Sequence, residues 1–238
     1  MMRSLLAALG FLTRVPVPVW VLKDAGVTKD SLVWYPAVGL LVGSVLWSLG
    51  WLGSDLPPLL RAALLLLVWV GLTGALHLDG LADSADAWVG GLGDRERTLA
   101  IMKDPRSGPM GVTAVVLVLL LKFAALASLP LAGTALWLAP MLARAAITAA
   151  FLCTPYVRSQ GLGSALTHAP RLACIAGVLA AVVLAAWCGW HGVRALLAVT
   201  VVFACWRYAC MHRLGGMTGD TLGALTELVE AAVLVALV

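Results

Sequence analysis

The sequence predicts an all-α polytopic membrane protein whose helices form one bundle. Of its 238 residues, 62% are hydrophobic and only 12% are charged, and the mean hydropathy is +0.99. In soluble globular domains about half of the residues are apolar and about a quarter are charged. The sequence contains no linker rich in Pro, Ser or Gly and no long run of charge, so we expect residues 1–238 to form a single transmembrane domain.

Seven stretches are long and apolar enough to cross a bilayer as helices, which requires roughly 20 residues each. They are residues 32–53, 57–77, 109–129, 131–152, 171–190, 193–211 and 220–238. Pro57, Pro109 and Pro130 lie at expected helix ends, where proline is tolerated. Before them, residues 1–20 resemble a signal peptide. However, Arg14 and Pro16 interrupt the apolar stretch and no small-residue cleavage site follows, so we do not expect the segment to be cleaved off. We expect this segment to be retained as an interfacial or re-entrant segment.

The basic residues predict the orientation of the bundle. Twelve of the 16 Lys and Arg residues fall on alternate connections, and the side rich in Lys and Arg faces the cytoplasm. This places the N terminus in the cytoplasm and the C terminus outside. The acidic residues are a separate observation, because the positive-inside rule counts only Lys and Arg. Among the connections, only Asp55 falls on the predicted outer side. Chemistry is therefore expected at the cytoplasmic face.

Two classes of function are disfavoured by composition. The net charge is +4, but the basic residues are scattered through short loops and do not form a stripe, so we expect no nucleic-acid binding. The five cysteines lie in or beside apolar segments and form no Cys-x-x-Cys pair, which is typical of small buried hydrophobic residues.

The stretch GALHLDGLADSADAW, residues 74–88, places three aspartates at the end of an apolar segment. On a helix, Asp79, Asp83 and Asp86 stand at i, i+4 and i+7 and so share one face. Like charges at these spacings repel, whereas a divalent cation turns the repulsion into coordination, and oxygen ligands favour Mg²⁺. The alternative is a solvated or helix-capping cluster. His77 is either a catalytic group or a core histidine with a hydrogen-bond partner.

A second motif, LAIMKDPRSGPMG at residues 99–111, combines basic side chains with a helix start. Lys103 and Arg106 precede Gly108, Pro109 and Gly111, and both the free amides and the helix dipole at such a start favour an anion. The sequence thus predicts a phosphate site here. The alternative is a positively charged membrane anchor before an ordinary helix that begins at proline.

The third motif, RLGGMTGDTLGALTELVE at residues 213–230, brings acidic residues into the last apolar helix. Three glycines precede or begin this helix: Gly215, Gly216 and Gly219. Asp220 and Glu227 share a helix face, and Glu230 lies beside Glu227. Ionisable groups inside an apolar membrane helix are energetically unfavourable, so where they occur they usually have a function. Glu227 and Glu230 therefore need a partner, which either a metal ion or Arg144 could supply.

Together these motifs indicate phosphoryl transfer. Magnesium held by carboxylates bridges phosphate oxygens while basic side chains neutralise the remaining charge. Several arginines lie near the predicted cytoplasmic face, and each is either a membrane anchor or a phosphate ligand. They are Arg14, Arg158, Arg207 and Arg213. A hydroxyl nucleophile would also need a carboxylate or histidine base within reach.

At these residues the sequence resembles the cobalamin synthases, the adenosylcobinamide-GDP ribazoletransferases of bacteria and archaea. The resemblance covers almost the whole chain and lies in FLTRVPVP (11–18), WYPAVGLLVG (34–43), GALHLDGLADSADAW (74–88), IMKDPRSGPMG (101–111), Arg144 followed by PYVRSQGLG (155–163), and GGMTGDTLGALTELVE (215–230). The third and the last motifs are the most specific in combination, because neither is generic to membrane helices.

The resemblance implies a magnesium-dependent enzyme of the bacterial cytoplasmic (inner) membrane, surrounded by membrane lipid. A ribose hydroxyl of α-ribazole, or of its 5′-phosphate, attacks the cobinamide-side phosphorus of adenosylcobinamide-GDP; adenosylcobalamin, or its 5′-phosphate, forms and GMP leaves. The implied metal ligands are Asp79, Asp83, Asp86, Asp220 and Glu227. The implied catalytic residues are His77, Asp83 and Glu227. The implied substrate-binding residues are Arg14, Lys103, Arg106, Arg158, Gly216 and Gly219.

Two other functions remain alternatives at this point. A CDP-alcohol phosphotransferase also uses an aspartate-rich helix and magnesium, but DGLADSADA lacks the Ala-Arg pair that follows Asp-Gly in that family. An ion-coupled transporter would line a pathway with Arg144, Glu227 and Glu230, yet transporter sites lie near the midplane between repeats, and no repeat is visible. The sequence is compatible with a homo-oligomer as well as a monomer.

Overall fold

The structure is a computed structural model that describes residues 2–130, 133–158 and 162–238, and all regular elements within these ranges are helices. The predicted all-α class is confirmed. The elements are α1 (Met2–Leu12), α2 (Val19–Lys23), α3 (Ala25–Asp30), the 3-10 helix η1 (Ser31–Trp34), α4 (Tyr35–Leu52), α5 (Pro58–Thr73), α6 (Leu76–Gly90), α7 (Arg95–Ile101), α8 (Pro109–Ser128), α9 (Ala135–Cys153), α10 (Leu162–Leu166), α11 (Arg171–Ala186), α12 (Gly189–Leu214) and α13 (Gly219–Leu237).

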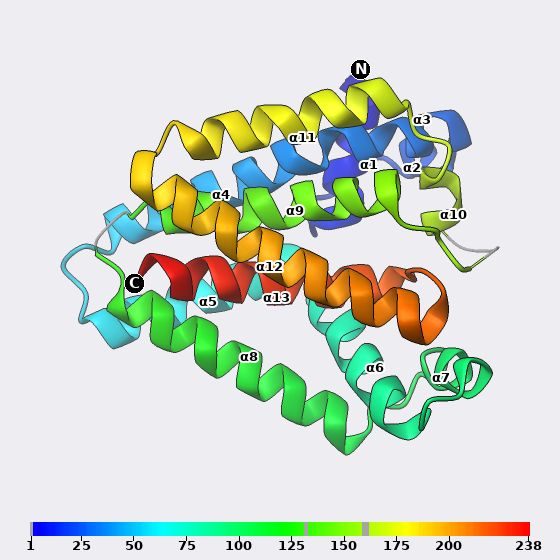
Figure 1. The fold of residues 1–238 in the computed structure, drawn as a ribbon. Helices are drawn as coiled ribbons and strands as arrows, with labels where there is room; N and C mark the ends of the chain where they lie inside the picture. Colours follow the sequence, from blue (N-terminus) through cyan, green and yellow to red (C-terminus); the bar gives the residue numbers. More distant parts are fainter. Residues whose placement is uncertain (1, 131–132, 159–161) are drawn as a thin grey trace.

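The long helices run side by side, as Figure 1 shows, and each of the seven predicted stretches overlaps one of them. By length and composition, four helices in the described part could cross a membrane, or five if the bent pair of α5 and α6 is one span. The polytopic character is therefore confirmed. Helix α11 is short, with 16 residues, and α13 contains three acidic residues, so the count of seven stays a prediction.

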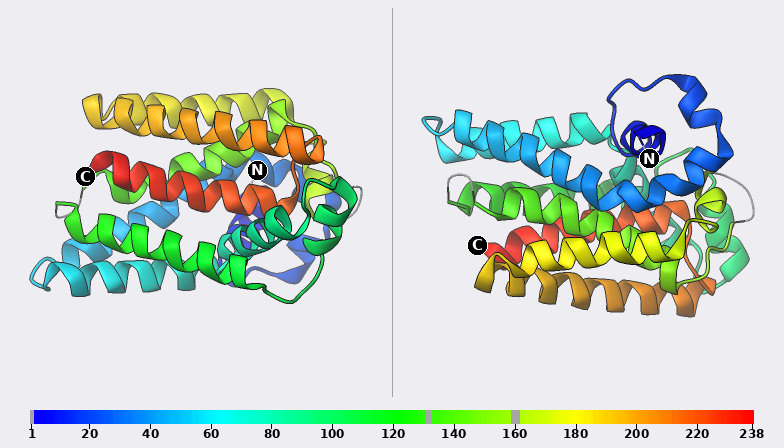
Figure 2. Two further views of the ribbon diagram at one scale, coloured as in Figure 1. Left: turned by 60° about the horizontal axis from the view of Figure 1, so that its bottom comes forward. Right: turned by 90° about the horizontal axis from the view of Figure 1, so that it is seen from above.

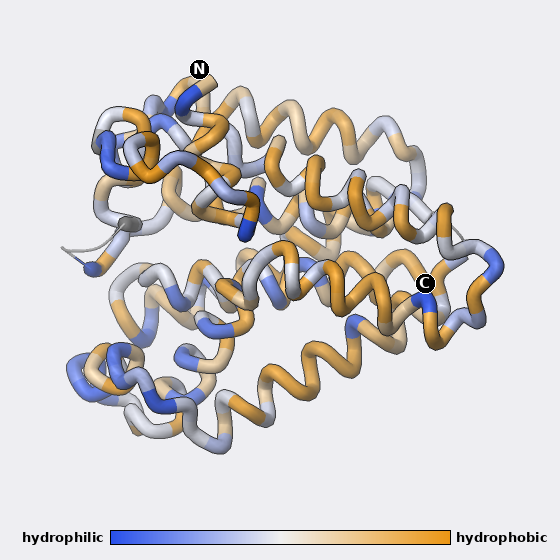
Figure 3. The backbone as a smooth tube through the Cα atoms, turned by 180° about the vertical axis from the view of Figure 1, so that it is seen from behind, coloured by the Kyte–Doolittle hydropathy of each residue, from blue (hydrophilic) through white to orange (hydrophobic). Residues whose placement is uncertain are grey.

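The short helices gather at one end of the bundle. Figure 2 shows α1, α2, α3, α6, α7 and α10 at this end, while the connection between α4 and α5 and the C terminus lie at the other. Most of the hydrophilic segments in Figure 3 belong to the same end. The segments that the basic residues predict to be cytoplasmic are thus brought together at one end.

The second predicted helix, residues 57–77, is interrupted. Helix α5 ends at Thr73, and Gly74 and Ala75 adopt positive φ angles of 62° and 57°. This left-handed turn bends the chain by 87°, so that α6 starts at Leu76 and runs across the end of the bundle. A Cβ atom at residue 74 would lie 2.3 Å from Nε of Arg14. The FLTR segment therefore covers the break between α5 and α6.

Helix α9 lies at the centre of the bundle and packs closely against α4. Fourteen of its 19 residues are buried. A Cβ atom at Gly39 would lie 2.3 Å from the carbonyl oxygen of Pro140, and one at Gly43 would lie 2.4 Å from Cα of Trp137. Small residues at such contacts let two membrane helices approach at backbone distance.

Replacing Gly39 with Ala should destabilise the bundle. The added methyl group would collide with the backbone of α9, and overpacking of this kind costs about 1–3 kcal/mol. The matched control is Gly71→Ala, because a Cβ atom at Gly71 meets nothing within 4 Å. Denaturant unfolding in detergent should show a lower free energy of unfolding for Gly39→Ala only. Equal stability of the two variants would contradict this packing.

Candidate active site

Glycines bring α6 against the start of α13. A Cβ atom at Gly80 would lie 2.7 Å from the carbonyl oxygen of Asp220, and one at Gly223 would lie 3.2 Å from that of His77. The two backbones therefore pack without intervening side chains. This contact places Asp79 of the first motif next to Asp220 of the third, 141 positions later in the sequence.

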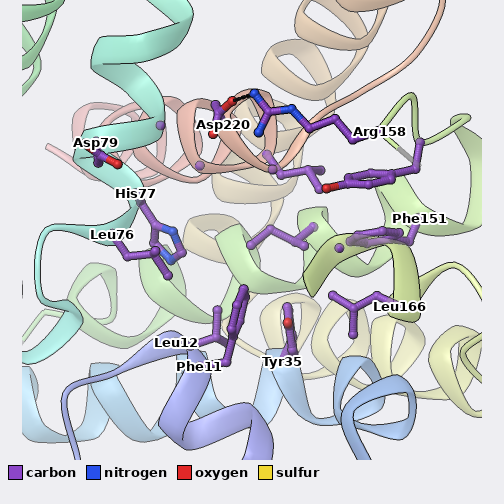
Figure 4. A pocket seen from close by; sticks show the side chains of 17 residues that line it. Phe11, Leu12, Tyr35, Leu76, His77, Asp79, Phe151, Arg158, Leu166 and Asp220 are labelled. Carbon is purple, nitrogen blue, oxygen red and sulfur yellow. Dashed lines mark hydrogen bonds and ion pairs between the residues drawn. The ribbon is translucent and has the colours of Figure 1, made fainter. Parts of the chain in front are cut away.

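A cavity of about 300 Å³ opens where these helices meet α1, α4, α9 and α10. Its polar side chains lie toward one wall, and Figure 4 shows His77 and Asp79 on α6 and Asp220 on α13, with Arg158 reaching toward Asp220. The remaining wall is apolar and largely aromatic, formed by Phe11, Leu12, Tyr35, Ile147, Phe151 and Leu166. The cavity thus combines a charged side with a side suited to flat apolar groups.

Arg158 binds the acidic cluster directly. Its Nη2 donates to Oδ2 of Asp220 at 2.5 Å and to the Met102 carbonyl oxygen at 3.4 Å, while its buried Nε has no hydrogen-bond partner. The phosphate contact predicted for Arg158 stays a prediction, for which the guanidinium still has donors that are not used within the protein. Residues 159–161 of the same PYVRSQGLG motif lie outside the described residues.

The segment that positions Arg158 is paired with the chain before α13. The Val157 amide donates to the Met217 carbonyl oxygen at 2.9 Å, and the Met217 amide donates to the Pro155 carbonyl oxygen at 2.8 Å. A Cβ atom at Gly216 would lie 2.3 Å from that Pro155 oxygen. Gly216 is buried at this pairing and does not line the cavity, so its predicted substrate contact stays a prediction without support from the structure. Gly219 does line the cavity.

Tyr156 is a cavity residue that the motifs did not single out. Its ring stacks on Phe151 with centroids 5.6 Å apart, and the Gly219 amide interacts with its hydroxyl. Burial raises the pKa of the Tyr156 phenol, so this hydroxyl stays protonated at neutral pH and keeps a proton to donate. The sequence signal that could have pointed to Tyr156 was its position in the PYVRSQGLG motif, two residues before Arg158.

Negative charge accumulates around Asp83. The negative charges of Asp79, Asp220 and Asp86 repel that of the Asp83 carboxylate. Among the charged groups with the largest effect on Asp83, Arg158 alone attracts it. Across the described ranges, no three His, Cys, Asp or Glu side chains are close enough together to hold a metal ion. Mg²⁺ usually binds one or two carboxylates together with substrate phosphates and water. Asp79, Asp83 and Asp220 offer carboxylate oxygens of the kind that Mg²⁺ binds one or two at a time, so the magnesium site stays a prediction.

Asp86 faces a different partner. Its two carboxylate oxygens accept hydrogen bonds from the amides of Gly108 at 2.6 Å and Gly111 at 2.8 Å. Both oxygens are thus used to hold the start of α8, and the predicted metal role of Asp86 lacks support. The predicted phosphate site at this helix start also lacks support, because the Gly108 and Gly111 amides already bind the carboxylate of Asp86.

The two basic residues of the second motif lie outside the cavity. Arg106 donates from Nη2 to Oδ2 of Asp104 at 2.7 Å, and this pairing lowers the pKa of the Asp104 carboxyl to about 2. Arg106 and Lys103 are both exposed, and neither lines the cavity. The structure therefore does not bring them to Asp79 and Asp220. Arg14, at the break above α6, is also exposed.

Glu227 belongs to a separate group of four buried charges inside the bundle. Lys122 of α8 donates to Oε2 of Glu227 and to Oε2 of Glu230, each at 2.5 Å. Arg144 of α9 donates to Oε1 of Glu230, which confirms Arg144 as a partner, and Nζ of Lys122 lies 4.9 Å from the Trp69 ring centroid. The predicted metal or base role of Glu227 lacks support, because its carboxylate is paired with Lys122.

The four charged residues of this group pair with one another, so their burial does not by itself call for the pathway of the transporter alternative. Sequence reasoning missed the role of Lys122. The signal was a lysine in the middle of an apolar helix, a position that requires a buried partner.

Other arginines near this end connect helices. Arg207 donates to the Cys153 carbonyl oxygen at 2.9 Å, Arg213 donates to that of Trp88 at 2.6 Å, and Arg95 donates to that of Leu214 at 2.7 Å. Of the two interpretations open for Arg207 and Arg213, membrane anchor or phosphate ligand, the structure favours neither. Both side chains hold helix ends together.

The fold and the cavity define a polytopic α-helical membrane protein with clustered carboxylates and an arginine at one end of its bundle. A family model described as Cobalamin-5-phosphate synthase matches residues 4–238. The chain belongs to this family, as its motifs predicted, and is a transferase.

The curated relatives share one name, adenosylcobinamide-GDP ribazoletransferase, and match over nearly their full length. An adenosylcobinamide-GDP ribazoletransferase of Pseudomonas aeruginosa is 56% identical over 241 residues, covering 99% of this chain and 98% of the relative. Those of Stutzerimonas stutzeri and Pseudomonas syringae are 55% and 52% identical, covering 99% and 97% of this chain and 98% and 96% of the relatives. No solved structure matches the chain.

Replacing Glu230 with Gln should destabilise the protein strongly. The change leaves the buried cations Lys122 and Arg144 with one carboxylate, and breaking a buried ion pair costs roughly 3–5 kcal/mol. The control is Glu96→Gln on exposed α7, which should change stability by less than about 0.5 kcal/mol. The free energy of unfolding in detergent measures both. A Glu230→Gln variant as stable as the control would show that the four charges do not hold the bundle together.

Proposed function

We propose that the protein is a magnesium-dependent phosphotransferase that joins adenosylcobinamide-GDP to α-ribazole or α-ribazole 5′-phosphate. The product is adenosylcobalamin or its 5′-phosphate, and GMP is released. The observation that supports this most is the meeting of Asp79, Asp220 and Arg158 at one cavity. The names of the relatives supply the two substrates.

In this reaction a ribose hydroxyl oxygen bonds to the cobinamide-side phosphorus, and the bond from that phosphorus to the oxygen of the departing GMP breaks. Bound Mg²⁺ would be held by one or two carboxylates from among Asp79, Asp83 and Asp220, together with pyrophosphate oxygens and water, and would neutralise charge on the pyrophosphate. Arg158 would bind a phosphate oxygen through its guanidinium, beside its contact with Asp220. The hydroxyl of Tyr156 lies on the same cavity and can donate to an anionic oxygen.

The proton of the attacking hydroxyl requires a base. His77 is 4% exposed, lines the cavity, and its Nε2 has no hydrogen-bond partner. An imidazole nitrogen without a hydrogen-bond partner is a candidate to accept this proton. We therefore favour His77 over Glu227 among the predicted catalytic residues, with Asp83 as a metal ligand.

We also propose that the protein is a multi-pass protein of the bacterial cytoplasmic membrane, surrounded by lipid, with its cavity and N terminus cytoplasmic and its C terminus outside. The grouping of the basic connections at the end of the bundle that contains the cavity supports this orientation. It would give the cavity access to nucleotide substrates in the cytoplasm.

Membranes containing the protein should form the cobalamin product and GMP from adenosylcobinamide-GDP and α-ribazole when Mg²⁺ is present, and EDTA should stop the reaction. Asp83→Asn should lower turnover by at least about 100-fold, because a metal ligand is lost. Asp55→Asn, an exposed change at the opposite end, is the control and should keep full activity. Turnover that persists in EDTA would refute the metal requirement, and near-normal activity of Asp83→Asn would refute its assignment.

The orientation can be tested with two exposed serines at opposite ends of the bundle, Ser54 and Ser107. In intact cells, a membrane-impermeant maleimide should label Ser54→Cys and should label Ser107→Cys only after permeabilisation. The unmodified protein gives the background from the native cysteines. The reverse labelling pattern would overturn the proposed orientation.

A further inference from the structure

A second cavity of about 280 Å³ lies directly beside the first. It is lined by residues of α1, α2, α3, η1, the start of α4, α6 and α10. Four side chains from four different helices line both cavities: Phe11, Tyr35, Leu76 and Leu166. We call the second cavity the inner chamber. A molecule that passes these four side chains would have one part in the inner chamber and the other next to Arg158 and Asp220.

The inner chamber offers almost no hydrogen bonds to a ligand. Its polar side chains are already used within the protein, since the Ser31 hydroxyl donates to the Thr28 carbonyl oxygen at 2.6 Å and the Thr28 hydroxyl donates to that of Leu22 at 3.3 Å. The Tyr35 hydroxyl interacts with Ser31. A buried polar group without a partner is destabilising by roughly 1–3 kcal/mol. The chamber therefore favours a ligand part with few polar atoms.

The boundary between the cavities is shaped for a flat group. The rings of Phe11 and Tyr35 are stacked, with centroids 6.2 Å apart and planes inclined by 22°. Aromatic rings prefer offset or edge contacts with other rings, so these two side chains present a surface suited to a planar heterocycle. The chamber volume suits a bicyclic ring and is much too small for a corrin macrocycle.

We propose that the inner chamber binds the aromatic base of the acceptor nucleoside. This inference rests on the proposed function and specifies where one of its substrates binds. A base with a hydrocarbon edge, such as a benzimidazole, matches the apolar lining. Guanine would place its amide and amino groups among apolar side chains without partners, so the nucleotide of the other substrate is excluded from the chamber. With the base inside, the attached ribose lies on the side of Arg158 and Asp220, where its hydroxyl is needed.

Filling the chamber tests this assignment. Ala7 lines the chamber and is 2% exposed, so Ala7→Leu should raise KM for the acceptor nucleoside by about tenfold or more, the effect of about 1.4 kcal/mol of lost binding. KM for adenosylcobinamide-GDP should stay within about twofold. The control is Ala232→Leu, the same change in an apolar groove between α8, α12 and α13, which should alter neither value. Thr28→Leu fills the chamber from another helix, in case Ala7→Leu does not fold.

A binding measurement separates this inference from the proposed function. Benzimidazole alone, titrated into the purified wild-type protein by calorimetry, should bind, and it should not bind to Ala7→Leu or Thr28→Leu. Absence of turnover by the wild type would refute the proposed function but not this binding result. An unchanged acceptor KM in both chamber variants of an active enzyme would overturn the inference. So would a chamber that retains lipid acyl chains and excludes benzimidazole.

Discussion

Four buried charges between α8, α9 and α13 determine how the bundle fits together. Lys122, Arg144, Glu227 and Glu230 are each at most 5% exposed, and an unpaired charge in this setting would be severely destabilising. Because each glutamate must meet its cation, α13 cannot slide by one helical turn along α8 and α9 without leaving charges unpaired. The ion pairs thereby fix the height of α13 in the bundle, and with it the position of its first turn.

The first turn of α13 is where the charged wall of the cavity is assembled. Gly80 and Gly223 let α6 lie against this turn at backbone distance, and the left-handed residues Gly74 and Ala75 direct α6 across the end of the bundle. A continuous helix through this region would have pointed its aspartates along α5, away from Asp220. The break in the chain and the two glycines are therefore as necessary to the site as the carboxylates are.

Hydropathy and helical spacing were sufficient to predict the helical bundle, the common end of the basic connections and the shared helix face of Asp79 and Asp83, whereas Asp220 was grouped with them by the family resemblance. They were not sufficient for Asp86 or Glu227. Spacing within one helix shows which carboxylates share a face, but the partners of these two, the amides of Gly108 and Gly111 and the amine of Lys122, lie 22 to 105 positions away in the sequence. Only the packing of separate helices reveals such partners.

The structure thus separates two kinds of acidic residue that look alike in sequence. Inside the bundle the charges of two glutamates are balanced by those of Lys122 and Arg144, so this group has no excess charge. Around Asp83 the charges of Asp79, Asp220 and Asp86 outweigh that of Arg158, and Asp86 is turned toward α8. Excess negative charge at the edge of a cavity is stabilised by a cation, whereas a neutral buried group has no need of one. For this reason we place the proposed magnesium ion beside the aspartates of α6 and the first turn of α13, and not beside Glu227 and Glu230 further along α13.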